Sequence, residues 1–308
     1  MKYSAIILLE EKNEDFSEYI RMLHEAFSAR QDSFEIIIMA NGLEVFLKNE
    51  LEKMRRLDGR LKAFALNKKT SQAVCLKAAF KESRGEIIVV CGSYQQLTQD
   101  SFLKLLDSLD RNTDILSPWR QKRVDPSFNQ FQSKVFNLLV KLITKSNIHD
   151  LSCTVKVFRR EVLEETELYG NMYRFLPIVA EKNGFRNKEI KSEHYQERGK
   201  TGFYGFFEYL ERIIDIFTLY FNVRFTRKPL RFFSTLGASF FIIGLAVIIY
   251  IFCQKLFMGV DVGDRPALIL SILFMVLGAQ AASVGLLGEI IAFTHGRSRR
   301  AYIIEKEI

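Results

Sequence analysis

Cationic side chains are the residues of this sequence whose type and spacing most clearly suggest chemistry. The chain has 308 residues and a formal net charge of +8, which favours nucleic acid, a membrane surface or an anionic substrate as partner. The basic residues form two clusters, Arg224, Arg227, Lys228 and Arg231, and then Arg297, Arg299 and Arg300. Each cluster flanks a long apolar run, so the sequence predicts a membrane partner and no nucleic acid.

The cysteines favour neither a disulfide framework nor a zinc site. There are four of them, Cys75, Cys91, Cys153 and Cys253, and none forms a CxxC pair. A reduced, cytoplasmic compartment fits this pattern. The N-terminal apolar run is too short for a signal-peptide core, and it is predicted to be a first buried strand.

Two uncharged apolar runs near the C-terminus are predicted to span a membrane. They cover about 232–253 and 266–288, and each would be on the order of 33 Å long as a helix. The competing interpretation, a pair of core helices in a soluble domain, is disfavoured by their length. The basic clusters lie outside the pair, so the positive-inside rule predicts a hairpin with both termini cytoplasmic. Small residues at helical spacing (Gly278, Ala281, Ala282, Gly285) predict close helix contact.

The remaining sequence alternates short apolar runs with longer helical patterns. Strands are expected at Tyr3–Leu9, Glu35–Met39, Ala63–Leu66, Glu86–Val90, Asp114–Ser117 and Thr154–Phe158. Helices are expected at Asp15–Ala29, Ser71–Glu82, Thr98–Asp110, Asn129–Lys145 and Asn171–Asn183. This order predicts an α/β domain with a mainly parallel sheet, whose ligands would bind at the carboxyl ends of the strands. Residues 203–221 form an amphipathic pattern that fits an interfacial helix or a domain-packing helix.

Several stretches in the second half resemble one known family. Asp150–Arg160 is similar to Asp-x-x-Cys-x-x-Lys/Arg-x-Phe-Arg-Arg, and Leu168–Pro177 to Tyr-Gly-x-Met-x-Arg-Phe-Leu-Pro. His194–Gly205 is similar to a mobile His-x-x-Arg loop, and Leu286–Ile291 to the end of a last span. The chain therefore resembles, over its whole length, the family 2 glycosyltransferases of GT-A fold that load a sugar onto polyprenyl phosphate.

The donor-binding half departs from that family. Where the family has Asp-x-Asp-x-Gln after the fourth strand, this chain has Cys91, Ser93 and Gln95. Relatives use Mg²⁺ or Mn²⁺ held by those carboxylates, and neither a thiol nor a neutral hydroxyl replaces a carboxylate for such hard cations. We therefore expect no metal and no other cofactor at this position.

The resemblance implies roles for further residues. Asp150 and Arg198 are the candidate catalytic residues, Asp150 as a base or positioning group and Arg198 on the loop that meets the donor diphosphate. The candidate substrate-binding residues are Asn41, Asn67, Gln95, Arg120, Lys122, Lys156 and Arg174. Two basic pairs, Lys68–Lys69 and Lys122–Arg123, could help Arg120 to neutralise the diphosphate without a metal, or form a solvated basic surface.

Two functions stay open at this point. The first is transfer of a sugar from a nucleotide-sugar to polyprenyl phosphate on the cytoplasmic leaflet. The second is a catalytically degenerate pseudoenzyme that binds polyprenyl phosphate or a partner in cell-surface glycan assembly; a homo-oligomer is compatible with either. A channel is disfavoured because the spans hold no charge and no marked pathway.

The expected organisation has four parts. Residues 1–202 form the GT-A-like domain, 203–228 the juxtamembrane helix, 229–290 the transmembrane hairpin and 291–308 a cytoplasmic tail. The expected location is the inner or plasma membrane, with more than one pass.

Overall fold

The structure is a computed structural model that falls into two compact units. One comprises Met1–Leu219 with Arg300–Ile308, and the other Tyr220–Arg299. The residues that the structure describes are 1–10, 16–42, 59–121, 137–141, 144, 146, 148–166, 168, 170, 172–195, 214, 218, 229–259 and 266–295. The juxtamembrane segment 203–228, apart from 214 and 218, and residues 296–308 of the expected tail lie outside them, whereas 291–295 are helical.

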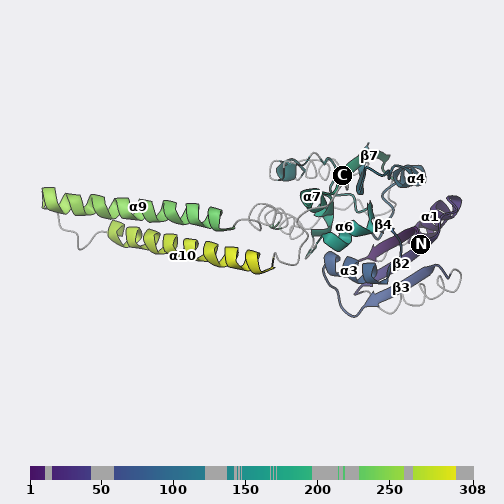
Figure 1. Cartoon of the computed structure of the whole chain (residues 1–308), viewed down its shortest axis with the longest axis horizontal. Coiled ribbons are helices and arrows are strands. Elements are labelled where there is room, and N and C mark those ends of the chain that lie inside the picture. The colour runs from purple at the N-terminus through teal and green to yellow at the C-terminus, as the bar shows by residue number, and fades with distance from the viewer. Residues whose placement is uncertain are drawn as a thin grey trace, which may run out of the picture. The chain divides into compact units, whose positions relative to one another are not determined.

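The first unit is built on a seven-stranded sheet (Figure 1). Its strands are β1 Tyr3–Leu9, β2 Phe34–Asn41, β3 Leu61–Leu66, β4 Ile87–Cys91, β5 Ile115–Gln121, β6 Lys156–Arg159 and β7 Asn187–Glu193. The spatial order is β3-β2-β1-β4-β6-β5-β7, and among these strands β6 runs against its neighbours β4 and β5. The expected α/β class with a mainly parallel sheet is confirmed.

Helices cover both faces of the sheet. They are α1 Phe16–Ala29, α3 Gln72–Glu82, α4 Gln99–Asp107, α6 Arg160–Glu165, the 3₁₀ helix η1 Met172–Phe175 and α7 Leu176–Lys182. Residues of α1 and α4 share one core cluster with the sheet, and residues of α3, α6 and α7 share the other. Because both faces are covered, the central strands β1 and β4 are almost entirely apolar.

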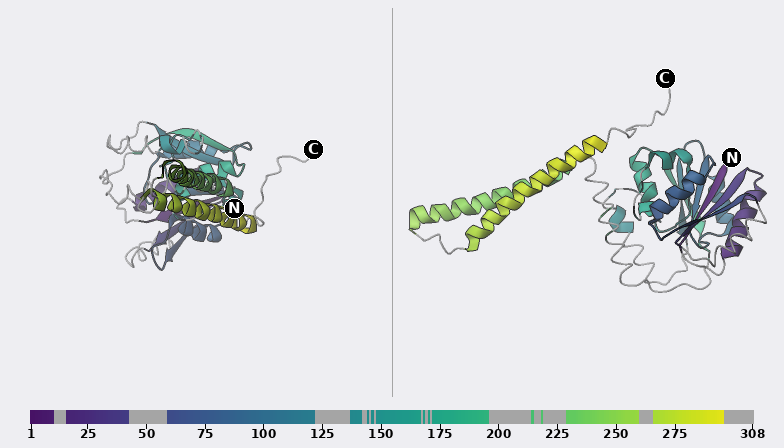
Figure 2. Two further views of the ribbon diagram at one scale, coloured as in Figure 1. Left: turned by 90° about the vertical axis from the view of Figure 1, so that its left-hand side faces the viewer. Right: turned by 90° about the horizontal axis from the view of Figure 1, so that it is seen from below.

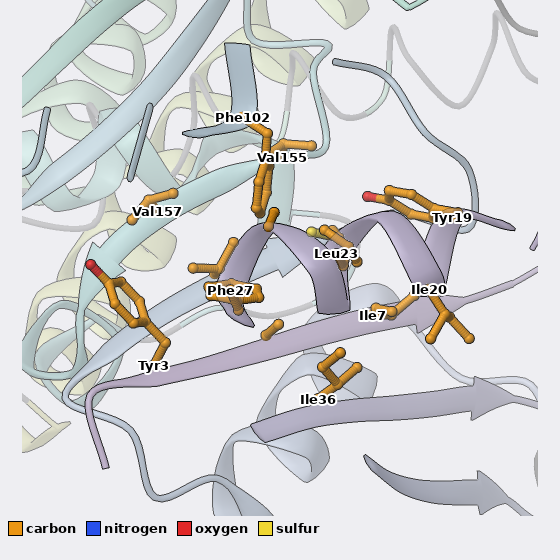
Figure 3. Close-up of a cluster of buried hydrophobic side chains, with 14 of the residues drawn as sticks. Tyr3, Ile7, Tyr19, Ile20, Leu23, Phe27, Ile36, Phe102, Val155 and Val157 are labelled. Carbon is orange, nitrogen blue, oxygen red and sulfur yellow. The ribbon is translucent and has the colours of Figure 1, made fainter. Parts of the chain in front are cut away.

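The core beneath α1 shows how the sequence pattern produces the packing. The apolar residues of α1 recur at helical spacing, and Figure 3 shows Tyr19, Leu23 and Phe27 pointing from the helix toward the strands. Alternate residues of β1, including Ile7, point into this cluster, while Ile6 belongs to the cluster on the opposite face. Strand β1 therefore contributes side chains to both cores, one on each face of the sheet.

The structure corrects three local expectations. Strand β7 and helix α6 were not predicted, and the single helix expected over Asn171–Asn183 is η1 followed by α7. Pro177 lies in the first turn of α7, where its missing N–H costs no helical hydrogen bond. Of the helix expected over Asn129–Lys145, residues 137–141 and 144 are helical and the others lie outside the described residues.

The second unit is a pair of long apolar helices, α9 Pro229–Met258 and α10 Pro266–His295, which run side by side (Figure 2). Within them, Leu230–Phe257 and Pro266–Ile291 are long and apolar enough to cross a membrane, and only 17% and 11% of their most apolar windows are buried. Core helices of a soluble domain would be mostly buried, so the exposed apolar surface favours lipid as the surroundings.

Small residues bring the two helices into close contact. A Cβ atom added at Gly278 would lie 2.6 Å from the carbonyl oxygen of Gly237, and one added at Gly237 would lie 2.5 Å from that of Gly278. The predicted contact at Gly278 is therefore confirmed. At the end away from the connecting loop, the Glu289 carboxylate accepts a hydrogen bond from the backbone N–H of Leu230 at 3.3 Å.

Candidate functional site

The candidate site residues gather at one edge of the sheet. Strands β1 to β5 and β7 all run toward this edge, and the antiparallel β6 begins there. The edge therefore collects Asn41 and Cys91 at strand ends, Arg120 near the end of β5, and Lys156 at the start of β6. The chain proceeds from β1 to β2 and β3 on one side and returns to β4 on the other, so the boundary between β1 and β4 is the topological switch point where α/β sheets bind ligands.

Ser93 joins the two strands at the switch point. Its hydroxyl donates to the carbonyl oxygen of Leu8 at 3.1 Å and accepts from the backbone N–H of Glu10 at 3.0 Å. The Glu10 carboxylate in turn accepts from the Gln72 side chain at 2.9 Å. The proton and one lone pair of the Ser93 hydroxyl are thus committed to the backbone of the first strand.

Cys91 points into the core and not toward the edge. It is 0% exposed and belongs to the cluster beneath α1. Burial raises the pKa of its thiol to about 12, although a hydrogen bond with Tyr19 acts in the opposite direction. The protonated thiol is a poor ligand for a hard cation.

Asn41 stabilises the loop after β3. Its side-chain oxygen accepts from the backbone N–H of Thr70 at 2.8 Å, and its side-chain nitrogen donates to the Thr70 carbonyl oxygen at 2.8 Å. Gly42 has a φ of +71°, and a Cβ there would lie 2.3 Å from the Lys69 backbone nitrogen. Asn67 is exposed on this loop. The structure therefore gives Asn41 a loop-fixing role and leaves Asn67 accessible to a ligand.

Gln95 and Gln96 differ in their surroundings. Gln95 is half-buried and donates to the carbonyl oxygen of Leu97 at 2.9 Å. Gln96 is 2% exposed, and its side-chain oxygen accepts from the Thr154 N–H at 2.8 Å and from the Thr154 hydroxyl at 2.9 Å. Sequence reasoning missed Gln96, for which adjacency to the family's glutamine was the available signal.

Asp150 and Arg120 form a buried ion pair. The Arg120 guanidinium donates through Nε to one carboxylate oxygen at 2.7 Å and through a terminal nitrogen to the other at 3.1 Å. Both side chains are 4% exposed. The Asp150 carboxylate also accepts from the Ser152 N–H at 3.2 Å and from the Ser152 hydroxyl at 2.8 Å.

A second group of contacts holds the segment in front of Asp150. The Glu189 carboxylate accepts from the backbone N–H of His149 at 2.7 Å and from that of Asp150 at 3.2 Å. The His149 ring stacks on Trp119, with ring centroids 4.2 Å apart. Trp119 directly precedes Arg120 in the sequence, and His149 directly precedes Asp150.

Lys156 lies beneath this segment and is 1% exposed. Its ammonium donates to the carbonyl oxygen of Cys153 at 2.7 Å and lies 5.1 Å from the centre of the Tyr173 ring. Burial lowers the pKa of Lys156 to about 8. The charge of Arg174, a half-buried residue of η1, adds slightly to this lowering. In this structure, therefore, Lys156 contacts protein and not solvent.

The predicted residues Lys122, Arg123 and Arg198 lie outside the described residues. The other candidates are near the ends or beginnings of neighbouring strands or in the loops between them, as described above. Glu10, Gln72 and Glu189 were not predicted, because their partners are distant in the sequence.

The residues at the two positions where the resemblance leads us to expect metal-binding carboxylates do not fit a divalent cation. Cys91 offers a buried, protonated thiol, and Ser93 offers a hydroxyl bonded to β1. Among the residues that the structure describes, no three His, Cys, Asp or Glu side chains are grouped so that they could hold a metal ion. Magnesium and manganese prefer several oxygen ligands, including carboxylates.

A mainly parallel α/β sheet with polar residues at its carboxyl edge, followed by two apolar helices, defines the class of protein. The chain belongs to glycosyl transferase family 2, whose model matches residues 12–166, about half of its length. The resemblance and the GT-A-like fold expected from the sequence are thereby confirmed.

Curated relatives match nearly the whole chain. The dodecaprenyl-phosphate galacturonate synthase of Rhizobium johnstonii is 24% identical, over 96% of this chain and 89% of its own. The undecaprenyl-phosphate 4-deoxy-4-formamido-L-arabinose transferase of Proteus mirabilis is 24% identical, over 100% of this chain and 94% of its own.

A solved structure has a similar fold. It is glucosyl-3-phosphoglycerate synthase from Mycobacterium tuberculosis in complex with Mn²⁺, uridine diphosphate and phosphoglyceric acid. It is 8% identical, with a TM-score of 0.51 over 71% of this chain and 78% of that one. At this identity the likeness concerns the fold alone.

Proposed function

We propose that this chain transfers a sugar from a nucleotide-sugar to polyprenyl phosphate on the cytoplasmic leaflet of the membrane. The observation that carries the proposal is the match of the relatives over almost the full chain, because it includes the two apolar helices as well as the α/β domain. A lipid acceptor is found at a membrane, and a membrane anchor holds the site near it.

The finer organisation belongs to the same proposal. The chain crosses the inner or plasma membrane twice and keeps both termini in the cytoplasm, because the basic clusters lie outside the hairpin. Residues 1–202 act as the transferase domain, 203–228 as the juxtamembrane helix, 229–290 as the hairpin and 291–308 as a cytoplasmic tail. A homo-oligomer or a glycan-assembly partner is compatible with this arrangement.

Within the proposed site, Asp150 acts mainly by positioning. Its carboxylate already accepts hydrogen bonds from Arg120 and Ser152, so it orients the guanidinium and fixes the segment that contains Ser152. A guanidinium oriented in this way suits an oxygen of the donor diphosphate. Arg198 and Lys122 remain proposed contacts to the donor diphosphate.

The experiment is a transfer assay with purified full-length protein in detergent. Undecaprenyl phosphate and a panel of radiolabelled UDP- and GDP-sugars are supplied, and the lipid product is separated by thin-layer chromatography. Transfer of label to lipid is expected for at least one donor. A matched pair of variants tests the site: Asp150→Asn should lower the rate at least about a hundredfold, and Asp100→Asn, which is exposed on α4, should not.

Trp119 provides the folding control for this pair. Its fluorescence reports whether the stacking on His149 survives in Asp150→Asn. Failure of every donor to label lipid, in a preparation that still binds polyprenyl phosphate, would contradict the transferase and support the pseudoenzyme.

A further inference from the structure

The loop after β3 carries positive charge to the edge of the sheet where the donor would bind. Lys68 and Lys69 follow the end of β3 and are both exposed. Asn41 fixes the backbone at Thr70 with hydrogen bonds of 2.8 Å, and Gly42 packs directly against the backbone of Lys69. The two ammonium groups thus project from a backbone anchored to β2.

Among the residues that the structure describes at the neighbouring switch point, no group of side chains could hold a hard cation, and the Glu10 carboxylate is hydrogen-bonded to Gln72. Cys91 is turned into the core, and the Ser93 hydroxyl is bonded to Leu8 and Glu10. A divalent cation would need several oxygen ligands that these two positions do not supply. The charge of a donor diphosphate must then be balanced by cationic side chains.

We infer that the donor diphosphate binds without a divalent cation, and that Lys68 and Lys69 supply the positive charge. This inference rests on the proposed function, because it concerns the same nucleotide-sugar donor. In the transfer step, an oxygen of the lipid phosphate forms a bond to the anomeric carbon as the bond to the diphosphate oxygen breaks. The electron pair stays on the departing nucleoside diphosphate, and the two ammonium groups stabilise that added negative charge.

Isothermal titration calorimetry on the full chain in detergent tests this inference without turnover. UDP and GDP are titrated into protein with excess EDTA, with Mg²⁺ and with Mn²⁺, and uridine and guanosine serve as ligands without phosphate. We expect at least one diphosphate to bind in EDTA with an affinity within about twofold of that in either metal. The corresponding nucleoside should bind at least about tenfold more weakly, since charge-assisted hydrogen bonds to phosphate are lost.

Two double variants test the assignment to the loop. Lys68→Gln with Lys69→Gln should weaken diphosphate binding about tenfold or more and leave nucleoside binding unchanged. Lys77→Gln with Lys81→Gln removes the same charge from exposed positions on α3 and should change neither.

Three outcomes would overturn the inference, and they differ in whether they also contradict the proposed transferase function. Diphosphate binding that appears only with Mg²⁺ or Mn²⁺ would contradict metal-free binding and leave the transferase intact. Equal effects of the two double variants would contradict the role of Lys68 and Lys69. Absence of diphosphate binding under every condition would overturn the inference and the proposed donor together.

Discussion

The Cys91 side chain points into the core, and this direction determines how substitutions at position 91 affect stability. Its thiol is 0% exposed beneath α1, so a carboxylate introduced there would be buried among the apolar side chains of that cluster. We expect Cys91→Asp to destabilise the fold by about 3 kcal/mol or more, and Cys91→Ala by about 1 kcal/mol. Thermal unfolding of the full chain, followed by Trp119 fluorescence, measures both. Equal stability of the two variants would show that position 91 faces solvent.

Lys156 makes folding stability depend on pH in a predictable direction. Its pKa is lowered from 10.5 to about 8 in the folded chain, so between these values the unfolded chain holds a proton that the folded chain has released. Stability from this group therefore rises with pH through that window, and the cost of burying the ammonium is fully present below about pH 8.

The substitution that tests this is Lys156→Met. The stability of the variant relative to the native chain should fall by about 2 kcal/mol between about pH 7 and about pH 10, because only the native chain gains stability there. Chemical denaturation of both proteins at the two pH values measures the change. Lys77→Met, on an exposed position, is the control and should show no such change. A constant difference across the range would mean that Lys156 keeps its charge in the fold.

At the residue scale, sequence reasoning identified positions better than contacts. Asp150 and Arg120 were both predicted site residues, yet their pairing across 30 positions of sequence depends on the order of β5 and β6 in the sheet. Cys91 was predicted to be a lost metal ligand, but a strand-end side chain can point into the core or away from it. Local sequence does not fix that direction without the register of the neighbouring strands.

At the scale of elements, the close contact between α9 and α10 depends on glycines, which have no side chain at the contact. Gly278 and Gly237 allow each helix to approach the other's carbonyl oxygens, where a Cβ would lie 2.6 Å and 2.5 Å away. We expect Gly278→Leu to separate the helices, whereas Ala279→Leu on the exposed side should leave them packed. Spin labels at Ile243→Cys and Ile272→Cys, in a Cys253→Ser background, report the separation by electron paramagnetic resonance. Identical distance distributions in the two leucine variants would contradict packing through Gly278.

Helices and strands could be predicted from the sequence where burial requires their residues to be apolar. Strand β1 is buried at all seven of its residues, and its apolar sequence predicted its bounds correctly. Strand β7 was missed because its sequence, Asn-Lys-Glu-Ile-Lys-Ser-Glu, is polar and is buried only at Ser192. As an edge strand it is held by its parallel pairing with β5 over seven positions, which leaves no apolar period in the sequence.

At the scale of the whole molecule, the distribution of charge predicts the orientation in the membrane. The basic clusters flank the hairpin on the outside, and the connecting loop contains Asp264. We expect Asp264→Cys to react with a membrane-impermeant maleimide in intact spheroplasts, and Glu305→Cys to react only after lysis. Both variants carry Cys253→Ser so that the exposed native thiol does not interfere. The reverse labelling pattern would place both termini outside the cytoplasm.

The contact between Glu289 and Leu230 has a consequence for how the hairpin enters and stays in the membrane. The loop joins the two helices covalently at one end, and this hydrogen bond links them at the other end. Pulling them apart would leave a carboxylate and a helix-terminal N–H without their mutual partner beside hydrocarbon. The two helices should therefore insert, tilt and be extracted as a single body.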